Sequence, residues 1–247
     1  MEVVGLTDIG RMRENNEDNY FTYFNDNLIG GLVADGMGGH NAGEIASKIA
    51  VDTIKQFIIE KYNPKMDFME LSEVVRMAFN YANSAIFEKA KRTNNTIMGT
   101  TATLALIYQK KLILAHVGDS RCYKIEGGII TQLTNDHSYV AELLKNGHIS
   151  ESVAKMHPNR NMITRALGSE IGIKIDINIL DYKNQIIILT SDGLTNMLSD
   201  EQIKNTVILS DNLENATTAL VELANKKGGN DNITVVAFGN LKGETEK

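Results

Sequence analysis

Four apolar runs of the chain end beside an aspartate that has a glycine close to it, and this repetition limits the possible folds more than any other feature. The aspartates are Asp35, Asp119, Asp192 and Asp231. Each one taken singly indicates a turn, because Asp-Gly is a favoured turn dipeptide and aspartate hydrogen-bonds to its own backbone in turns. Four such carboxylates on one edge of a core would repel one another and lose hydration. A fold that gathers them therefore needs cations to relieve the repulsion.

The possible donors in this set are oxygen atoms, and with water completing an octahedron they suit Mg²⁺ or Mn²⁺. The glycine directly after Asp35 would let the carbonyl of Gly36 approach an ion closely. A charged segment near the N-terminus adds Glu17 and Asp18, which could join the cluster. It also contains Arg13, whose guanidinium fork suits a phosphate dianion. The alternative for this segment is a solvated loop without a chemical role.

The strand and helix patterns indicate a single domain over residues 1–247. Residues 173–179 alternate isoleucine with polar residues and predict a half-buried strand, while 101–108 and 111–117 flank a two-residue connection as a hairpin does. Further strands are expected at 28–34, 185–190 and 233–238, and helices at 45–58, 71–86, 199–208 and 213–224. Neighbouring strands without intervening helices favour antiparallel sheets, so the pattern predicts an α+β fold.

Composition narrows the classes of function. The 247 residues are 43% hydrophobic and 23% charged, as in an ordinary folded protein, and the net charge of −6 without a basic stripe argues against nucleic-acid binding. The single cysteine, Cys122, cannot form an internal disulfide, which suits a reducing compartment. Residues 1–17 lack the apolar run of a signal peptide, and no stretch approaches the roughly 20 apolar residues that span a bilayer. We therefore expect a cytoplasmic protein without membrane insertion.

Several other catalytic signatures are absent from the sequence. Cys122 is not followed by an arginine-bearing phosphate loop, and there is no Walker A sequence, no His-Glu-x-x-His and no EF-hand loop. The sequence therefore argues against a cysteine phosphatase, a P-loop NTPase and a calcium sensor.

Five segments occur in an order that resembles the metal-dependent type 2C protein phosphatases. They are 13–18 (RENNED), 35–40 (DGMGGH), 118–121 (GDSR), 191–194 (SDGL) and 231–234 (DNIT). Each segment alone is weak evidence for the family, but the combination is specific for it and spans essentially the whole chain. The Met-Gly-Gly-His form and the compact length resemble the bacterial branch of the family, which often opposes a membrane-anchored serine/threonine kinase.

The resemblance implies both a fold and a metal centre. The fold would be a sandwich of two antiparallel β-sheets flanked by helices, an α-β-β-α arrangement. The centre would hold two Mn²⁺ or Mg²⁺ ions at one end, with Asp35 bridging them. The Gly36 carbonyl and Glu17 would serve one ion, Glu17 through water in one version, and Asp192 and Asp231 would complete the other.

The same resemblance implies supporting roles and a reaction. Arg13 would hold the substrate phosphate, Asp18 would support the ligands from behind, and Asp119 with Asp192 could hold a third ion. A hydroxide bridging the two ions would attack phosphoserine or phosphothreonine in a protein substrate, without a phosphoenzyme.

Animal members of the family carry a histidine directly after the first Asp-Gly, and this histidine is proposed to be the general acid. In this chain Met37 occupies that position, so His40 is the candidate replacement, with a loop or helix-start role as the alternative. His116 alternates along a strand and is expected to be packed. His137 lies just before a predicted helix and is expected to cap it.

A long insertion is expected at about 139–168, because this stretch interrupts the strand pattern and is too long for a hairpin loop. Two short helices, 139–146 and 150–156, fit inside it. We predict a mobile flap with few apolar anchors, Val153 and Met156 among them, that recognises protein substrates beside the metals. The alternative is an ordinary insertion far from the site.

Two other functions remain compatible with these residues. One is a catalytically silent binding module of the same fold, although every proposed ligand is present. The other is a metal-dependent phosphoesterase that acts on a small molecule.

Overall fold

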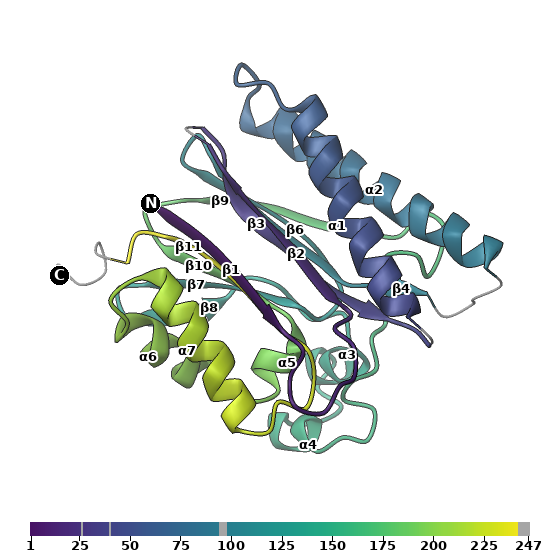
Figure 1. Ribbon diagram of the computed structural model, residues 1–247, viewed down its shortest axis with the longest axis vertical. Helices are drawn as coiled ribbons and strands as arrows, with labels where there is room; N and C mark the ends of the chain where they lie inside the picture. The colour runs from purple at the N-terminus through teal and green to yellow at the C-terminus, as the bar shows by residue number, and fades with distance from the viewer. Residues whose placement is uncertain (26, 40, 94–97, 242–247) are drawn as a thin grey trace.

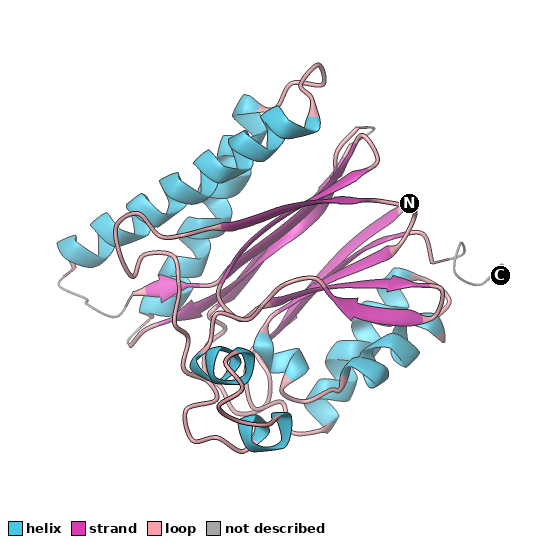
Figure 2. Cartoon of the chain, turned by 180° about the vertical axis from the view of Figure 1, so that it is seen from behind, coloured by secondary structure: helices cyan, strands magenta, loops and turns pink. Residues whose placement is uncertain are grey.

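The computed structural model describes residues 1–25, 27–39, 41–93 and 98–241. Two β-sheets lie face to face and carry helices on their outer faces (Figure 1). Figure 2 shows the same four layers from behind, with a helical layer on either side of the sheets. The predicted α+β fold and its α-β-β-α sandwich are therefore confirmed.

One sheet has five antiparallel strands in the order β1-β11-β10-β7-β8. These are β1 (Glu2–Asp8), β7 (Arg121–Glu126), β8 (Ile129–Gln132), β10 (Ile186–Thr190) and β11 (Ile233–Gly239). The first strand pairs with the last, from Glu2 opposite Gly239 to Asp8 opposite Ile233. This sheet therefore brings the two ends of the described chain together.

The other sheet has six strands, in the order β2-β3-β5-β6-β9 with β4 paired to β3. These are β2 (Asp18–Phe24), β3 (Ile29–Met37), β4 (Gly99–Thr100), β5 (Ala102–Tyr108), β6 (Lys111–Val117) and β9 (Asp176–Asp181). The predicted β5–β6 hairpin is confirmed. Its turn residues Gln109 and Lys110 have φ of 49° and 60°, which is the geometry of a type I′ turn.

Helices cover both outer faces and one end of the sandwich. The pair α1 (Ala42–Lys61) and α2 (Phe68–Arg92) covers the six-stranded sheet, and α6 (Asp200–Ile208) and α7 (Leu213–Lys226) cover the five-stranded sheet (Figure 1). The short helices α3 (Tyr139–Lys145), α4 (Glu151–Lys155) and α5 (Asp192–Thr195) lie together at one end. The predicted capping box at the start of α6 is present, with Ser199 bonded to the backbone of Gln202. No helix in the described ranges is long and apolar enough to cross a membrane.

Three apolar clusters hold these layers together. Side chains such as Val33, Leu114 and Phe238 fill the space between the sheets. A second cluster joins α1 and α2 to the six-stranded sheet, and a third joins α6 and α7 to the other sheet. The result is a rigid frame whose strand ends carry the polar residues discussed below.

The strand predicted at 173–179 begins three residues later and ends two residues later than predicted. Strand β9 begins at Asp176, opposite His116, and continues to Asp181, opposite Lys111. Residues before Asp176 have no strand to pair with, because β6 ends at Val117. Ile173 and Ile175 are nevertheless buried, in the cluster under α1 and α2. Strand β1 and helix α5 were not predicted from the sequence, since both are short and carry no strong periodic pattern.

Burial in α1 predicts a large difference in stability between two isoleucines of the same helix. Ile54 is fully buried and Ile59 is 48% exposed. Ile54→Ala is expected to lower the free energy of unfolding by about 2–5 kcal/mol, because a cavity is left in a packed cluster. Ile59→Ala should change it by less than about 0.5 kcal/mol. Urea denaturation of both variants measures this, and equal losses would contradict the assigned burial.

Candidate functional site

The candidate acidic residues meet at the end of the sandwich where α5 lies. Asp35 lies near the end of β3, Asp119 follows β6, Asp192 opens α5 directly after β10, and Asp231 precedes β11. Asp18 begins β2 directly opposite Asp35 in the β2–β3 ladder. Two sheets thus deliver their carboxylates to one place, as the sequence pattern predicted.

Asp35 is fixed by hydrogen bonds to its backbone rather than by a counter-charge. Its N–H donates to Thr101 Oγ1 at 2.9 Å, and its carbonyl accepts from Thr101 N–H and from Thr100 Oγ1, each at 2.8 Å. The carboxylate is thereby held while remaining available to a ligand.

Gly36 and Gly43 bring the start of α1 close to β3 beside Glu17. A Cβ on Gly36 would lie 2.1 Å from the Gly43 carbonyl oxygen, and a Cβ on Gly43 would lie 2.7 Å from Glu17 Oε1. Neither position can accept a side chain without moving the backbone. The Gly36 N–H donates to the Glu17 carbonyl at 3.1 Å, which fixes Glu17 next to the end of β3.

Arg13 reaches this end from the N-terminal loop. Its Nη2 donates to Asp231 Oδ2 at 2.8 Å, and the side chains of Arg13 and Asp231 are 48% and 27% exposed. The guanidinium is therefore paired on one side and open to solvent on the other. Its pKa is raised, chiefly by the hydrogen bond to Asp231.

Asn232 holds this loop in place. Its Nδ2 donates to the carbonyls of Ile9 and Asn15, both at 2.9 Å, and its Oδ1 accepts from the Glu17 N–H at 2.8 Å. The side chain is buried and connects residues more than 200 positions away in the chain. Asn232 lies within the 231–234 motif, but nothing in the sequence predicted this role for it.

Asp18 lies beneath the other carboxylates. Its Oδ2 accepts from Ser191 Oγ at 2.7 Å and from Thr234 Oγ1 at 2.6 Å, and its Oδ1 has no hydrogen-bond partner among the described residues. The supporting role that the family resemblance implies for Asp18 stays a prediction. Ser191 and Thr234 were not singled out as supports by the sequence analysis, although both lie within the recognised motifs.

Asp119 is buried and its Oδ1 also lacks a partner among the described residues. Unpartnered carboxylate oxygens in a buried site are costly, so each needs a ligand that the polypeptide does not supply. A divalent cation is such a ligand.

The raised pKa values of these carboxylates also indicate a site for a cation. Burial raises the pKa of Asp18 to about 7, that of Asp119 to about 8 and that of Asp192 to about 6. The pKa of Asp35 lies well above its ordinary value, because of burial first and then the charges of the neighbouring aspartates. Burial also raises the pKa of Glu17. These carboxylates disfavour one another's charge, which a bound cation would reverse.

The carboxylates do not yet stand in a coordinating arrangement. Among the described residues, no three His, Cys, Asp or Glu side chains form a group that could already hold an ion. Asp231 is turned to Arg13, and Asp192 accepts from Asn196 Nδ2 at 3.0 Å and interacts with Asp35. The donor chemistry and the unpartnered oxygens fit Mg²⁺ or Mn²⁺, and binding would require these side chains to exchange their present partners for the ion.

The structure tests the predictions for two of the three histidines, His116 and His137. His40 lies outside the described residues. His116 is buried, as predicted. The prediction that His137 caps α3 is wrong, because Ser138 Oγ accepts from the Ala141 N–H at 3.3 Å and occupies the N-cap position. His137 instead accepts from the Gly118 N–H through Nδ1 at 3.0 Å.

The predicted insertion at 139–168 lies at this same end and contains α3 and α4 (Figure 1). Its two predicted helices are confirmed. Val153 and Met156 are not anchors as expected, because they are 47% and 79% exposed. Among the residues of α4 whose side chains are described, Ala154 is buried and Val153 is exposed.

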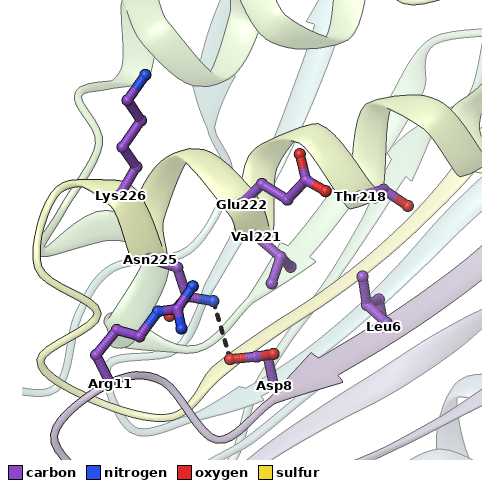
Figure 3. A pocket seen from close by; sticks show the side chains of 8 residues that line it. All are labelled: Leu6, Asp8, Arg11, Thr218, Val221, Glu222, Asn225 and Lys226. Atoms are coloured by element: carbon purple, nitrogen blue, oxygen red, sulfur yellow. Dashed lines mark hydrogen bonds between the residues drawn. The ribbon is translucent and has the colours of Figure 1, made fainter.

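A groove of about 540 Å³ lies elsewhere, between α7 and β1 (Figure 3). None of the candidate acidic residues lines it. Asp8 on its wall accepts from Asn225 Nδ2 at 2.9 Å and from the Gly10 N–H at 2.8 Å. These bonds hold the first part of the loop that carries Arg13, so the residues of this groove support that loop structurally.

Comparison with known proteins gives a consistent result. The family model for protein phosphatase 2C matches residues 11–234. The chain is 38% identical to protein phosphatase PhpP of Streptococcus pneumoniae, over 95% of this chain and 96% of that one. It is 37% identical to the serine/threonine phosphatase stp of Listeria monocytogenes, over 93% and 92%. The structure of Stp1 from Staphylococcus aureus superposes with a TM-score of 0.90 at 32% identity, covering 97% of this chain and 94% of that one. The PstP catalytic domain, solved with two manganese ions, gives 0.79 at 32%, covering 96% of each chain.

The raised pKa values predict how the stability of the metal-free protein changes with pH. In the unfolded chain the pKa of an aspartate is about 3.9. In the folded chain burial raises the pKa of Asp192 to about 6, that of Asp18 to about 7 and that of Asp119 to about 8. Between these limits the folded state binds more protons, so the free energy of unfolding falls as pH rises. In EDTA, Tm is expected to decrease from about pH 5 to pH 8. Added Mg²⁺ should raise Tm more at pH 8, because the ion requires ionised carboxylates.

A pair of variants controls this measurement. Asp119→Asn should flatten the dependence of Tm on pH, whereas Asp181→Asn, at an exposed aspartate of β9, should leave it steep. A metal-free Tm that stays level or rises from pH 5 to pH 8 would contradict the electrostatic assignment.

Proposed function

The chain belongs to the protein phosphatase 2C family and is a metal-dependent serine/threonine protein phosphatase, and from this premise we propose which of its residues carry the reaction. The observation that carries the proposal is the convergence of buried carboxylates from both sheets beside one partly exposed arginine. Such an arrangement can hold divalent cations and receive a phosphate at the same place.

The metal ligands are proposed as follows. Asp35 would be shared by the two ions, Glu17 and the Gly36 carbonyl would serve one of them, and Asp192 and Asp231 would serve the other. When bound, Mn²⁺ or Mg²⁺ would lower the pKa of a water molecule and offset charge on the phosphoryl oxygens. Asp18 keeps this set in place through Ser191 and Thr234.

Arg13 is proposed to bind the substrate phosphate. Its present partner, Asp231, is itself a proposed ligand, so an ion at Asp231 would free the guanidinium fork for the phosphate oxygens. The general acid stays a sequence-based prediction at His40. Asp119 is proposed to hold a third ion together with Asp192, on the basis of its buried, unpartnered Oδ1.

Residues 139–168 are proposed to act as a substrate flap. The segment lies at the site end, and its exposed apolar side chains include Tyr139, Val153, Met156 and Met162. A protein substrate offers apolar residues around its phosphorylated side chain, and a phosphorylated metabolite offers few. This surface is what favours a protein substrate over a small-molecule phosphoester.

The partner and the compartment are also proposals. A bacterial serine/threonine kinase would supply the phosphoserine and phosphothreonine that this site consumes. A cytoplasmic site of action is consistent with the buried free thiol of Cys122, since the fold does not depend on a disulfide.

The metal-ligand assignment predicts a loss of activity that is specific to position. Asp35→Asn and Asp231→Asn should each lower kcat/KM for a phosphothreonine peptide by about 100-fold or more, because each removes a charged ligand from an ion. Asp181→Asn, at an exposed position away from the site, should retain activity. Phosphate release in the presence of Mn²⁺ measures this. Near-normal turnover by either site variant, with its fold verified by circular dichroism, would refute the assignment.

The flap proposal predicts a dependence on the substrate. Val153→Ser with Met156→Ser should raise KM for a phosphopeptide about fivefold, since partial burial of two apolar side chains contributes roughly 1 kcal/mol. Turnover of p-nitrophenyl phosphate should not change. Ile129→Ser, which removes a 68% exposed side chain from β8, is the matched control and should affect neither substrate. Equal effects of the double variant on both substrates would argue against a substrate-selecting flap.

A further inference from the structure

Gly118 follows the last residue of β6 and directly precedes Asp119. His137 contacts the backbone of Gly118 at both of its polar groups. The Gly118 N–H donates to His137 Nδ1 at 3.0 Å, and the Gly118 carbonyl accepts from the His137 N–H at 2.7 Å. Gly118 has φ of +111°, and a Cβ there would lie 2.5 Å from Thr101 Cγ2. The turn is therefore enclosed by Thr101 on one side and His137 on the other.

The hydrogen bonds determine which ring nitrogen of His137 carries the proton. Nδ1 accepts from Gly118, so it holds no proton, and the neutral ring is protonated at Nε2. Nε2 lies 3.2 Å from Asp176 Oδ2, which accepts that proton's hydrogen bond. Arg165 Nη1 lies 2.9 Å from Nε2 and 3.0 Å from Asp176 Oδ1. With the proton on Nε2, the first of these is a contact between two donors, and Asp176 accepts from both groups.

His137 also touches the flap at its base. Its carbonyl accepts from the Thr164 N–H at 2.8 Å, and Arg165, the next residue, belongs to the same segment. At the other end of the segment, the Tyr139 N–H donates to the Met162 carbonyl at 2.8 Å. The imidazole therefore lies between the base of the flap and the turn that carries Asp119.

A second chain of bonds leads from this turn to Asp35. Ser120 Oγ, next to Asp119, lies 2.7 Å from Thr101 Oγ1, which accepts from the Asp35 N–H. The residues on either side of Asp119 are thus held in place, Ser120 by Thr101 and Gly118 by His137.

We propose that His137 is a positioning residue: through Nδ1 it holds the Gly118–Asp119 turn in the orientation in which Asp119 binds an ion, and it ties that orientation to the flap. The inference rests on the proposed function, because it takes Asp119 as the ligand of the third ion. Without the Nδ1 acceptor the Gly118 N–H would be buried and unpaired, a loss that favours rotation of the turn and of Asp119 with it.

Two amide variants separate the ring nitrogens. Asparagine places its Oδ1 near the position of Nδ1 and can accept from Gly118, whereas the longer glutamine side chain reaches toward the position of Nε2. His137→Gln should raise the Mn²⁺ concentration needed for half-maximal turnover of p-nitrophenyl phosphate by on the order of 10- to 100-fold. His137→Asn should stay close to the wild type, and kcat at saturating Mn²⁺ should be similar in all three proteins.

The same comparison in an Asp119→Asn background completes a double-mutant cycle. There the difference between the two His137 variants should vanish, because the ligand that His137 positions is gone. Equal Mn²⁺ requirements of His137→Asn and His137→Gln in the wild-type background would overturn the inference. If turnover by the unaltered protein does not depend on Mn²⁺ at all, the proposed function fails instead.

A measurement on the unaltered protein covers the case in which a variant does not fold. Nitrogen NMR of the histidine ring at neutral pH should show His137 protonated at Nε2 alone, and the Gly118 amide should exchange slowly with solvent. A proton on Nδ1, or a freely exchanging Gly118 amide, would overturn the inference, because the Gly118 N–H could not then be held by the ring.

Discussion

The burial of neighbouring carboxylates, together with their mutual repulsion, is the constraint on which the rest of this structure depends. Asp18, Asp35, Asp119 and Asp192 all resist ionisation in the folded chain, with burial as the first cause. A fold that keeps such groups together must hold them from outside the cluster. The three apolar clusters do so, since they fix the strands whose ends carry the acids.

The direct supports of the acids are mostly neutral. Thr101 holds Asp35, Ser191 and Thr234 hold Asp18, and Asn232 holds the loop of Arg13. Hydroxyl and amide groups fix position without cancelling charge, which leaves the negative potential of the site available to cations. Arg13 is the exception, since it is charged, partly exposed and paired with Asp231.

The flap is attached to this frame by polar contacts at its base and by the buried Leu167 near its end, while Val153, Met156 and Met162 face solvent. Asp136, His137 and Ser138 form the polar part of the attachment: Asp136 receives three bonds from the Arg121 guanidinium, His137 holds Gly118, and Ser138 caps α3. Both Gly118 and Arg121 flank the loop of Asp119. The segment proposed to recognise a substrate therefore lies next to Asp119, a proposed metal ligand.

The sequence by itself determined the elements whose signals are local. The β5–β6 hairpin, the capping box of α6 and the two flap helices follow from alternation, caps and spacing within a few residues. The acids at strand ends, and the family resemblance that their motifs carry, also pointed to the correct fold class. Only the tertiary structure decided the pairing of β1 with β11, the start of β9, the clamp made by Asn232 and the contacts of His137. Each of these depends on groups from distant parts of the chain that meet only in the folded state, and local propensity contains no information about such meetings.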